Sequence, residues 1–200
     1  MLSIYIGSSY LLKGSIRFDA DISRDFLLLD ELKTKKYILI GPRASGIPGV
    51  FHGPLWIYIN FPAYIFANGN PVGVGCGWIL IILFFLLSTY LFTKKITDNK
   101  TATIFTLLLS GALIPWYHQL LNPFGAFALI PILIFLITKY QKSKDYKYWI
   151  GVIFVLGGMI QFQMAVGVPL TILVLLRLTK WMYVNKKLIC VLSKGNPAIE

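Results

Sequence analysis

The chain has 200 residues, of which 56% are hydrophobic and only 14% are charged, and its mean hydropathy is +0.70. Soluble domains use about a quarter charged residues, so this composition excludes an ordinary soluble enzyme and predicts a polytopic membrane protein. The 19 basic residues outnumber the 8 acidic ones, but the lysines gather between apolar runs, which is typical of loops facing an anionic membrane leaflet rather than of a nucleic-acid-binding surface.

The first 12 residues are apolar up to Lys13. They are shorter than the roughly 20 residues that a membrane-spanning helix needs. No basic residue precedes the apolar run, which argues against a signal peptide. We interpret residues 1–12 as the remnant of a first transmembrane helix.

Residues 13–71 form a connection far longer than the about 12–15 residues beyond which a loop is usually functional or disordered, and they are too apolar for disorder. Within this loop, DISRDFLLLDELKTKK at residues 21–36 predicts a helix, with Asp21 as the candidate N-cap and lysines at the C-terminal end. At about 100° per residue, Asp21 and Asp25 fall on the apolar side of this helix. A carboxylate there carries a desolvation cost, so each needs a cap, an ion pair or a function. The apolar side is otherwise formed by Ile22, Phe26, Leu28, Leu29 and Leu32.

A Gly/Pro-rich segment with one cation, Arg43, then leads to His52, and residues 54–67 predict a short interfacial helix. Its Trp56, Tyr58 and Tyr64 suit the headgroup level of a membrane. An imidazole bonded to a headgroup or to backbone is the structural alternative to a binding role for His52.

The remainder of the chain, residues 72–187, predicts about five transmembrane helices, followed by a tail at 188–200. Val72–Phe92 is one span. Residues 101–138 have no charged residue and lysine-rich flanks at both ends, so they should cross twice, turning at PWYHQLLNPF. Residues 149–176 repeat this pattern around QFQ at 161–163, as two short spans or, alternatively, one long tilted helix.

These crossings place the unusual polar residues on one side of the membrane. Residues 13–71, residues 116–123, Gln161 and Gln163 all fall on the extracytoplasmic side. The two histidines of the chain, His52 and His118, are both among them. The predicted fold class is therefore an all-α, polytopic transmembrane helix bundle whose long extracytoplasmic first loop carries short interfacial helices.

The order of these motifs resembles the GT-C membrane glycosyltransferases, and within them the protein O-mannosyltransferase and aminoarabinose transferase-like group. DISRD at 21–25 matches the Asp-x-x-Arg form of the acidic motif that opens the first external loop of that family. His52-Gly53-Pro54-Leu55 corresponds to its Pro-Pro-Leu motif, with Gly53 in place of the first proline and Ile22 where Glu or Gln is usual. The resemblance covers about residues 17–170. Family members are much longer, with about twice as many spans, so the chain resembles an N-terminal fragment, and we expect the isolated chain to be incomplete as an enzyme.

The resemblance implies a sugar donor linked to a polyprenyl phosphate, an acceptor hydroxyl on a lipid, glycan or protein, and an inverting displacement at the plasma membrane, with the active site extracytoplasmic. A carboxylate suits the general base; Asp21 is the first candidate, with Asp19, which offers a competing alignment, as the second. Cations or donors must stabilise the leaving phosphate. The candidates for binding are Arg24, Arg43, His52 and His118.

No cluster of His or Cys has metal-ligand spacing, and Cys76 and Cys190 provide no disulfide framework. We therefore expect no metal, no cofactor and no nucleic-acid partner; membrane lipids are the expected surroundings. Three other classes remain open. They are a transport or lipid-linked-sugar flippase subunit, an O-antigen ligase-like enzyme or polymerase, and a non-catalytic fragment with a structural role. The uncharged spans argue against the first, and the early position of the large loop argues against the second.

Overall fold

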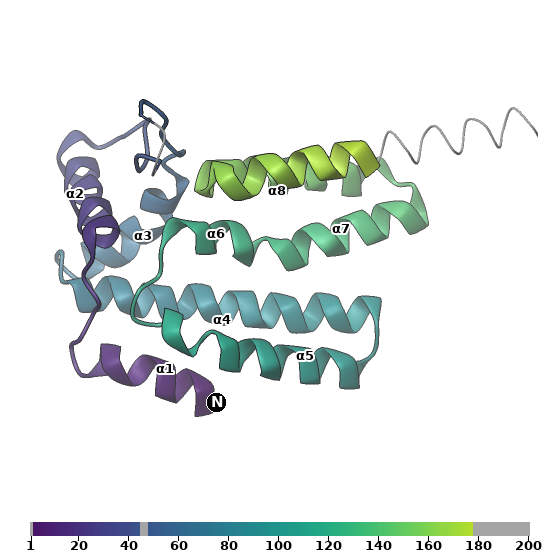
Figure 1. The fold of residues 1–200 in the computed structure, drawn as a ribbon, viewed down its shortest axis with the longest axis horizontal. Helices are drawn as coiled ribbons and strands as arrows, with labels where there is room; N and C mark the ends of the chain where they lie inside the picture. The colour runs from purple at the N-terminus through teal and green to yellow at the C-terminus, as the bar shows by residue number, and fades with distance from the viewer. Residues whose placement is uncertain (1, 45–47, 178–200) are drawn as a thin grey trace, which may run out of the picture. The chain divides into compact units, whose positions relative to one another are not determined.

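The computed structural model describes residues 2–44 and 48–177, and these residues are helical apart from their connections and a single bridge between Arg43 and Phe51. The predicted all-α class is confirmed. The chain forms two compact units, residues 1–167 and 168–200, and the fold and site below belong to the first unit (Figure 1). Its elements are α1 (Leu2–Leu12), α2 (Ala20–Lys35), α3 (Leu55–Phe66), α4 (Pro71–Ile96), α5 (Asn99–Ala112), the 3₁₀ turn η1 (Ile114–Trp116), α6 (Asn122–Ala128), α7 (Ile130–Ser143) and α8 (Tyr146–Phe162).

Among residues 2–44 and 48–177, two segments are long and apolar enough to cross a membrane, namely α4 and the pair α6–α7 taken together as Asn122–Ser143. The span predicted at residues 72–92 is thus observed as a helix of sufficient length. Asn70 caps α4 by accepting a hydrogen bond from Val72 N, and Lys94 and Lys95 occupy its last turn, where cations oppose the negative end of the helix dipole. The other apolar helices are shorter than 18 residues, so the full set of crossings stays a prediction.

The two predicted breaks in the later apolar stretches are both observed. α5 ends at Ala112, and the chain turns through η1 and residues 117–121 before α6 begins. α8 ends at Phe162, Gln163 has an extended backbone, and a further helix runs from Met164 to Arg177. The alternative of one continuous helix over residues 149–176 is therefore wrong. Lys180, Lys186, Lys187, Cys190 and the predicted tail lie outside the described residues.

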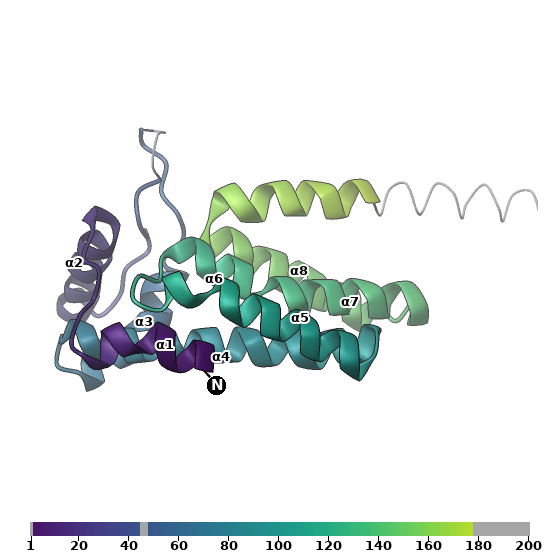
Figure 2. The same ribbon diagram turned by 60° about the horizontal axis from the view of Figure 1, so that its bottom comes forward.

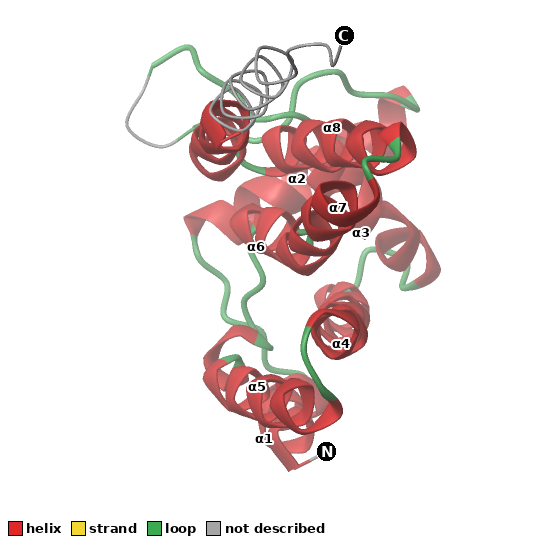
Figure 3. Cartoon of the chain, turned by 90° about the vertical axis from the view of Figure 1, so that its right-hand side faces the viewer, coloured by secondary structure: helices red, strands yellow, loops and turns green. Residues whose placement is uncertain are grey.

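α4 is the central helix of the first unit, in contact with α1, α3, α5, α6 and α7. Seen along the helices, α5 lies on one side of α4 and α7 on the other, with α8 packed on α7 (Figure 3). Val74, Trp78 and Ile82 of α4 are buried. Gly75 lets α1 approach α4 closely, because a Cβ at this position would overlap the side chain of Leu11.

α2 and α3 lie together at the end of the bundle where α4 begins (Figure 2). α2 matches the predicted helix, and the side that it buries includes Ile22, Leu29 and Leu32. Its N-cap is Asp19, whose Oδ1 accepts a hydrogen bond from Ile22 N at 2.9 Å. The expectation that Asp21 caps the helix is therefore wrong: the extended residue before the first turn is Asp19, and Asp21 already lies inside that turn.

Candidate functional site

Asp25 is the buried carboxylate of α2, only 7% exposed. Its Oδ2 accepts a hydrogen bond from Trp56 Nε1 of α3 at 3.0 Å. Its Oδ1 accepts from Arg24 Nε at 3.2 Å and Nη2 at 2.9 Å. The sequence placed Asp25 on the apolar side of its helix, and the ion pair with a nearby cation that this position requires is formed with Arg24.

The Arg24 guanidinium joins two carboxylates and a loop. Its Nη1 contacts Asp21 Oδ1 at 2.7 Å and lies 3.4 Å from the carbonyl oxygen of Arg43. The Asp21 side chain remains about half exposed, at 47%. We call Asp21, Arg24, Asp25 and Trp56 the Arg24 network. It brings the acidic stretch of α2 to the segment that follows His52.

Two buried side chains that the sequence did not single out extend this network to α4. Asn60 Nδ2 donates to the carbonyl oxygen of Trp56 at 2.8 Å, and Trp78 Nε1 donates to Asn60 Oδ1 at 2.9 Å. Trp56 is 2% exposed, so the expectation that it anchors a headgroup is wrong: its indole N–H is used by Asp25. One signal in the sequence was Asn60 itself, a polar amide inside the apolar run of residues 55–66.

The other two aromatics expected at headgroup level are also engaged within the protein. Tyr64 is buried, and its hydroxyl donates to Asp30 of α2. Tyr58 is partly exposed, and its hydroxyl bonds both the backbone N and the carbonyl oxygen of Ile38. Both rings therefore hold α3 against α2 and the loop that follows it.

His52 is 7% exposed and links the loop to the break after α8. Its Nδ1 accepts a hydrogen bond from the backbone N of Met164 at 3.4 Å. Burial lowers the pKa of His52, and the positive charge of Arg24 lowers it further. His52 is thus neutral at pH 7, with the proton on Nε2 because Nδ1 is the acceptor. A backbone bond, one of the two structural alternatives, is present, and the remaining Nε2–H is a donor rather than part of an imidazolium.

The polar segments predicted to share one side of the membrane meet at one end of the bundle. Asn122 Nδ2 donates to Gln163 Oε1 at 2.7 Å and to the carbonyl oxygen of Phe162 at 3.1 Å. Gly53 lies against Gln161, and a Cβ at Gly53 would overlap the Gln161 amide and crowd its Cα. These contacts bring residues 53, 122, 161 and 163 together, whereas their position on one side of a membrane stays a prediction.

The pKa of Asp25 is raised from 3.8 to about 6, chiefly because burial disfavours the charged form. Arg24 and the Trp56 hydrogen bond act in the opposite direction and hold the pKa down, while the Asp21 charge raises it. The carboxylate is therefore kept in the core at a cost in stability. Such a shift beside a specific cation is typical of functional sites, although structural ion pairs produce it too.

The other predicted site residues have separate positions. Asp19 is committed to capping α2. Arg43 is exposed and contributes its backbone to the network through its carbonyl oxygen. His118 packs against the Tyr10 ring of α1 at 5.5 Å between centroids, and its carbonyl oxygen accepts from Arg17 N at 3.2 Å. It belongs to a contact set other than the Arg24 network.

No protein-family model, curated protein or solved structure matches this chain significantly. Within the described residues, no group of three or more His, Cys, Asp or Glu side chains is placed to hold a metal ion. The chemistry that the site offers comes from a half-exposed carboxylate, an arginine between two carboxylates, and a neutral histidine with one N–H left to donate.

Proposed function

We propose that the chain belongs to an inverting, GT-C-type membrane glycosyltransferase that transfers a sugar from a polyprenyl-phosphate donor to an acceptor hydroxyl on the extracytoplasmic side of the plasma membrane. The observation that carries this proposal is the meeting of two motifs distant in sequence. Asp25, directly after the Asp-x-x-Arg stretch of α2, accepts a hydrogen bond from Trp56, directly after the His-Gly-Pro-Leu segment, and this bond joins positions 31 residues apart. In the resembled family, these two motifs form one catalytic loop.

The distribution of charge supports a multi-pass orientation with the Arg24 network outside. Lys94 and Lys95 lie at the C-terminal end of α4 and Lys142 in the last turn of α7. At 1.5 Å per residue, Pro71 and Lys95 are about 36 Å apart along α4, which is enough to cross the roughly 30 Å hydrocarbon core. With the lysines on the cytoplasmic side, α2 and α3 fall on the other side.

Asp21 is the carboxylate best suited to be the general base. Asp19 is used as a helix cap, and Asp25 is buried and bonded on both oxygens. Asp21 keeps about half of its exposure while Arg24 holds it at 2.7 Å. An acceptor hydroxyl could therefore approach it from solvent. Arg24, shared between two carboxylates, is better described as a positioning residue for Asp21 than as a phosphate ligand.

The leaving phosphate would be met by Arg43 and His52. Arg43 is exposed and has a full positive charge to offer, and His52 has the Nε2–H to donate because its Nδ1 is occupied by Met164 N. In the proposed step, the acceptor oxygen attacks the anomeric carbon and its proton passes to Asp21. The bond from the anomeric carbon to the phosphate oxygen breaks, and its electron pair leaves with the polyprenyl phosphate. A single displacement of this kind inverts the sugar.

This assignment is tested by comparing aspartate-to-asparagine variants of the protein expressed in its native cells. Asp21→Asn should reduce sugar transfer by about 10²-fold or more, the typical contribution of a general base, while the protein still folds. Asp19→Asn should retain most transfer, because asparagine is also a good N-cap. Full activity of Asp21→Asn together with loss in Asp19→Asn would move the base to Asp19. Full activity of both would refute the proposed function.

A further inference from the structure

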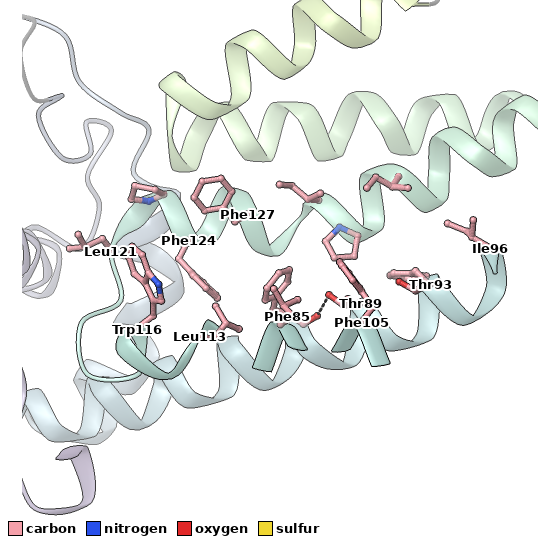
Figure 4. Close-up of a pocket in the computed structure, with 16 residues that line it drawn as sticks. Phe85, Thr89, Thr93, Ile96, Phe105, Leu113, Trp116, Leu121, Phe124 and Phe127 are labelled. Carbon is pink, nitrogen blue, oxygen red and sulfur yellow. Dashed lines mark hydrogen bonds between the residues drawn. The ribbon is translucent and has the colours of Figure 1, made fainter. Parts of the chain in front are cut away.

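An apolar groove lies along the half of α4 that leads to its lysines, away from the Arg24 network. It has a volume of about 480 Å³, within the about 300–1,000 Å³ typical of ligand pockets. Its lining comes from α4, from α5 and the connection to α6, and from α6–α7; Figure 4 shows α6–α7 facing α4 across the groove. On α4 its lining residues run from Phe85 to Ile96.

The lining offers almost nothing to a polar ligand. Phe92, Phe105, Leu109 and Ile134 contribute apolar surface. The hydroxyl of Thr89, a polar group within the groove, already donates to the carbonyl oxygen of Phe85 at 2.8 Å (Figure 4). The groove therefore suits a hydrocarbon chain, which requires no hydrogen-bond partner.

One end of the groove is positively charged. Lys95 of α4 and Lys139 of α7 approach the same ring, Phe135, with their Nζ atoms 5.4 and 5.7 Å from its centroid. Phe135 in turn stacks on Phe92 of the groove at 4.6 Å. Neither lysine forms an ion pair within the described part of the chain. Two unneutralised ammonium groups thus converge where a chain lying in the groove would end.

We infer that this groove binds one acyl chain of an anionic phospholipid, with the phosphate between Lys95 and Lys139. The hydrocarbon lining fits the chain and the two ammonium groups fit the headgroup, since lysines near a membrane surface attract anionic lipids. The lysine end lies about 26 Å along α4 from Trp78, which is linked to the Arg24 network through Asn60. The bound lipid therefore belongs to the opposite leaflet and is distinct from the sugar donor. The inference rests on the proposed membrane insertion, not on glycosyl transfer.

The test uses the purified protein in vesicles of phosphatidylcholine and phosphatidylglycerol at 3:1, with a trace of phosphatidylglycerol that carries a diazirine in one acyl chain. After irradiation, mass spectrometry should find adducts on Phe105, Leu109 or Ile134. A phosphatidylcholine probe of the same acyl chain should label these positions at least about tenfold less, given two lysines near the phosphate.

Two matched double variants distinguish an effect of the groove lysines on lipid labelling from a general effect of positive charge. Lys95→Gln with Lys139→Gln should reduce groove adducts by about tenfold or more. Lys94→Gln with Lys142→Gln removes the same net charge from the same helix ends and should leave them within about twofold, because Lys94 lies over the Tyr90 ring instead. Leu109→Trp, which fills the groove, should abolish the adducts with helical content unchanged.

Equal loss in the two double variants, equal labelling by both probes, or adducts only outside the groove would overturn the inference. A photoreactive amino acid at position 109 that crosslinks to protein in place of lipid would overturn it as well, since the groove would then hold a protein segment. Asp21→Asn should leave the adducts unchanged. A failure of the lipid site and a failure of the proposed glycosyl transfer are therefore distinguishable.

Discussion

Replacing Asp25 by asparagine should make the protein more stable at neutral pH. The substitution keeps the shape of the side chain and an oxygen that accepts the Trp56 indole N–H, now at 3.0 Å. It removes a charge that is buried in α2 at 7% exposure. Arg24 would lose one partner but keep Asp21 at 2.7 Å, and its own side chain is partly exposed.

The magnitude follows from the pKa of Asp25, which is raised from 3.8 to about 6 by burial. The folded protein thus holds this proton more tightly than the unfolded chain does. The contribution of Asp25 to stability is fully present below about pH 3.8 and is lost as the pH rises through about 6. At 1.36 kcal/mol per pKa unit, the loss is on the order of 3 kcal/mol.

The contribution of His52 to the pH dependence of stability must be separated from that of Asp25. The pKa of His52 is lowered rather than raised, so its effect on stability has the opposite sign. A histidine kept neutral by the fold contributes stability that is present above its ordinary pKa of about 6.5 and is lost as the pH falls. The wild-type profile combines both groups. The difference between wild type and Asp25→Asn at each pH isolates the carboxylate.

The measurement is the thermal unfolding midpoint, followed by tryptophan fluorescence in detergent micelles between pH 4 and 8. Wild type and Asp25→Asn should be close near pH 4, and the variant should be more stable by about 6–12 °C at pH 7. Asp21→Asn is the matched control: its side chain is about half exposed, so no comparable burial cost is removed. Parallel profiles for wild type and Asp25→Asn would refute the argument that a desolvated carboxylate is held in this core.

Three further results are expected. Gly53→Ala should destabilise the protein by about 1–3 kcal/mol and lower its unfolding midpoint, because the added Cβ meets Gln161. Gly157→Ala on α8 is the control: a Cβ there meets no atom within 4 Å, so the midpoint should not fall. His52→Asn should keep the unfolding midpoint closer to wild type than His52→Ala, because only asparagine retains an acceptor for the backbone N–H now bound by Nδ1; equal midpoints would show that this bond contributes nothing. In a cysteine-free background of the cell-expressed protein, a cysteine at Asn68 should react with an impermeant reagent from outside and one at Lys144 should not, and the reverse pattern would invert the proposed orientation.

Much of the helical framework was predictable because it depends on local signals. Three features can be read directly from the residue types in the sequence: the uncharged run of α4 between polar flanks, the prolines of the 115–124 turn and the polar QFQ break. The amphipathic pattern of α2 also placed Asp25 on the buried side. The N-cap was missed by two residues because Asp19 and Asp21 both suit the start of a helix, and spacing does not distinguish them.

The site was less predictable because it depends on contacts between distant segments. A tryptophan beside a membrane is ordinarily interfacial, but Trp56 is buried, donates to Asp25 and packs against Phe162. The His52 bond to Met164 N spans 112 positions, and no periodicity encodes it. The lipid groove arises from the way α5 and α7 pack on α4, so its volume has no signature in the sequence.

Glycosyl transfer is measured most directly as the release of polyprenyl phosphate from polyprenyl-phosphate-linked sugars, in proteoliposomes that contain the protein expressed in its native cells, together with membrane-derived acceptors. Release should depend on the protein, and the sugar should be recovered on an acceptor in inverted configuration. Asp21→Asn should lower this release by about 10²-fold or more, and Asp19→Asn should leave most of it. Release that is the same for wild type and Asp21→Asn, or that is absent with every donor while the protein remains folded, would contradict the proposed glycosyl transfer.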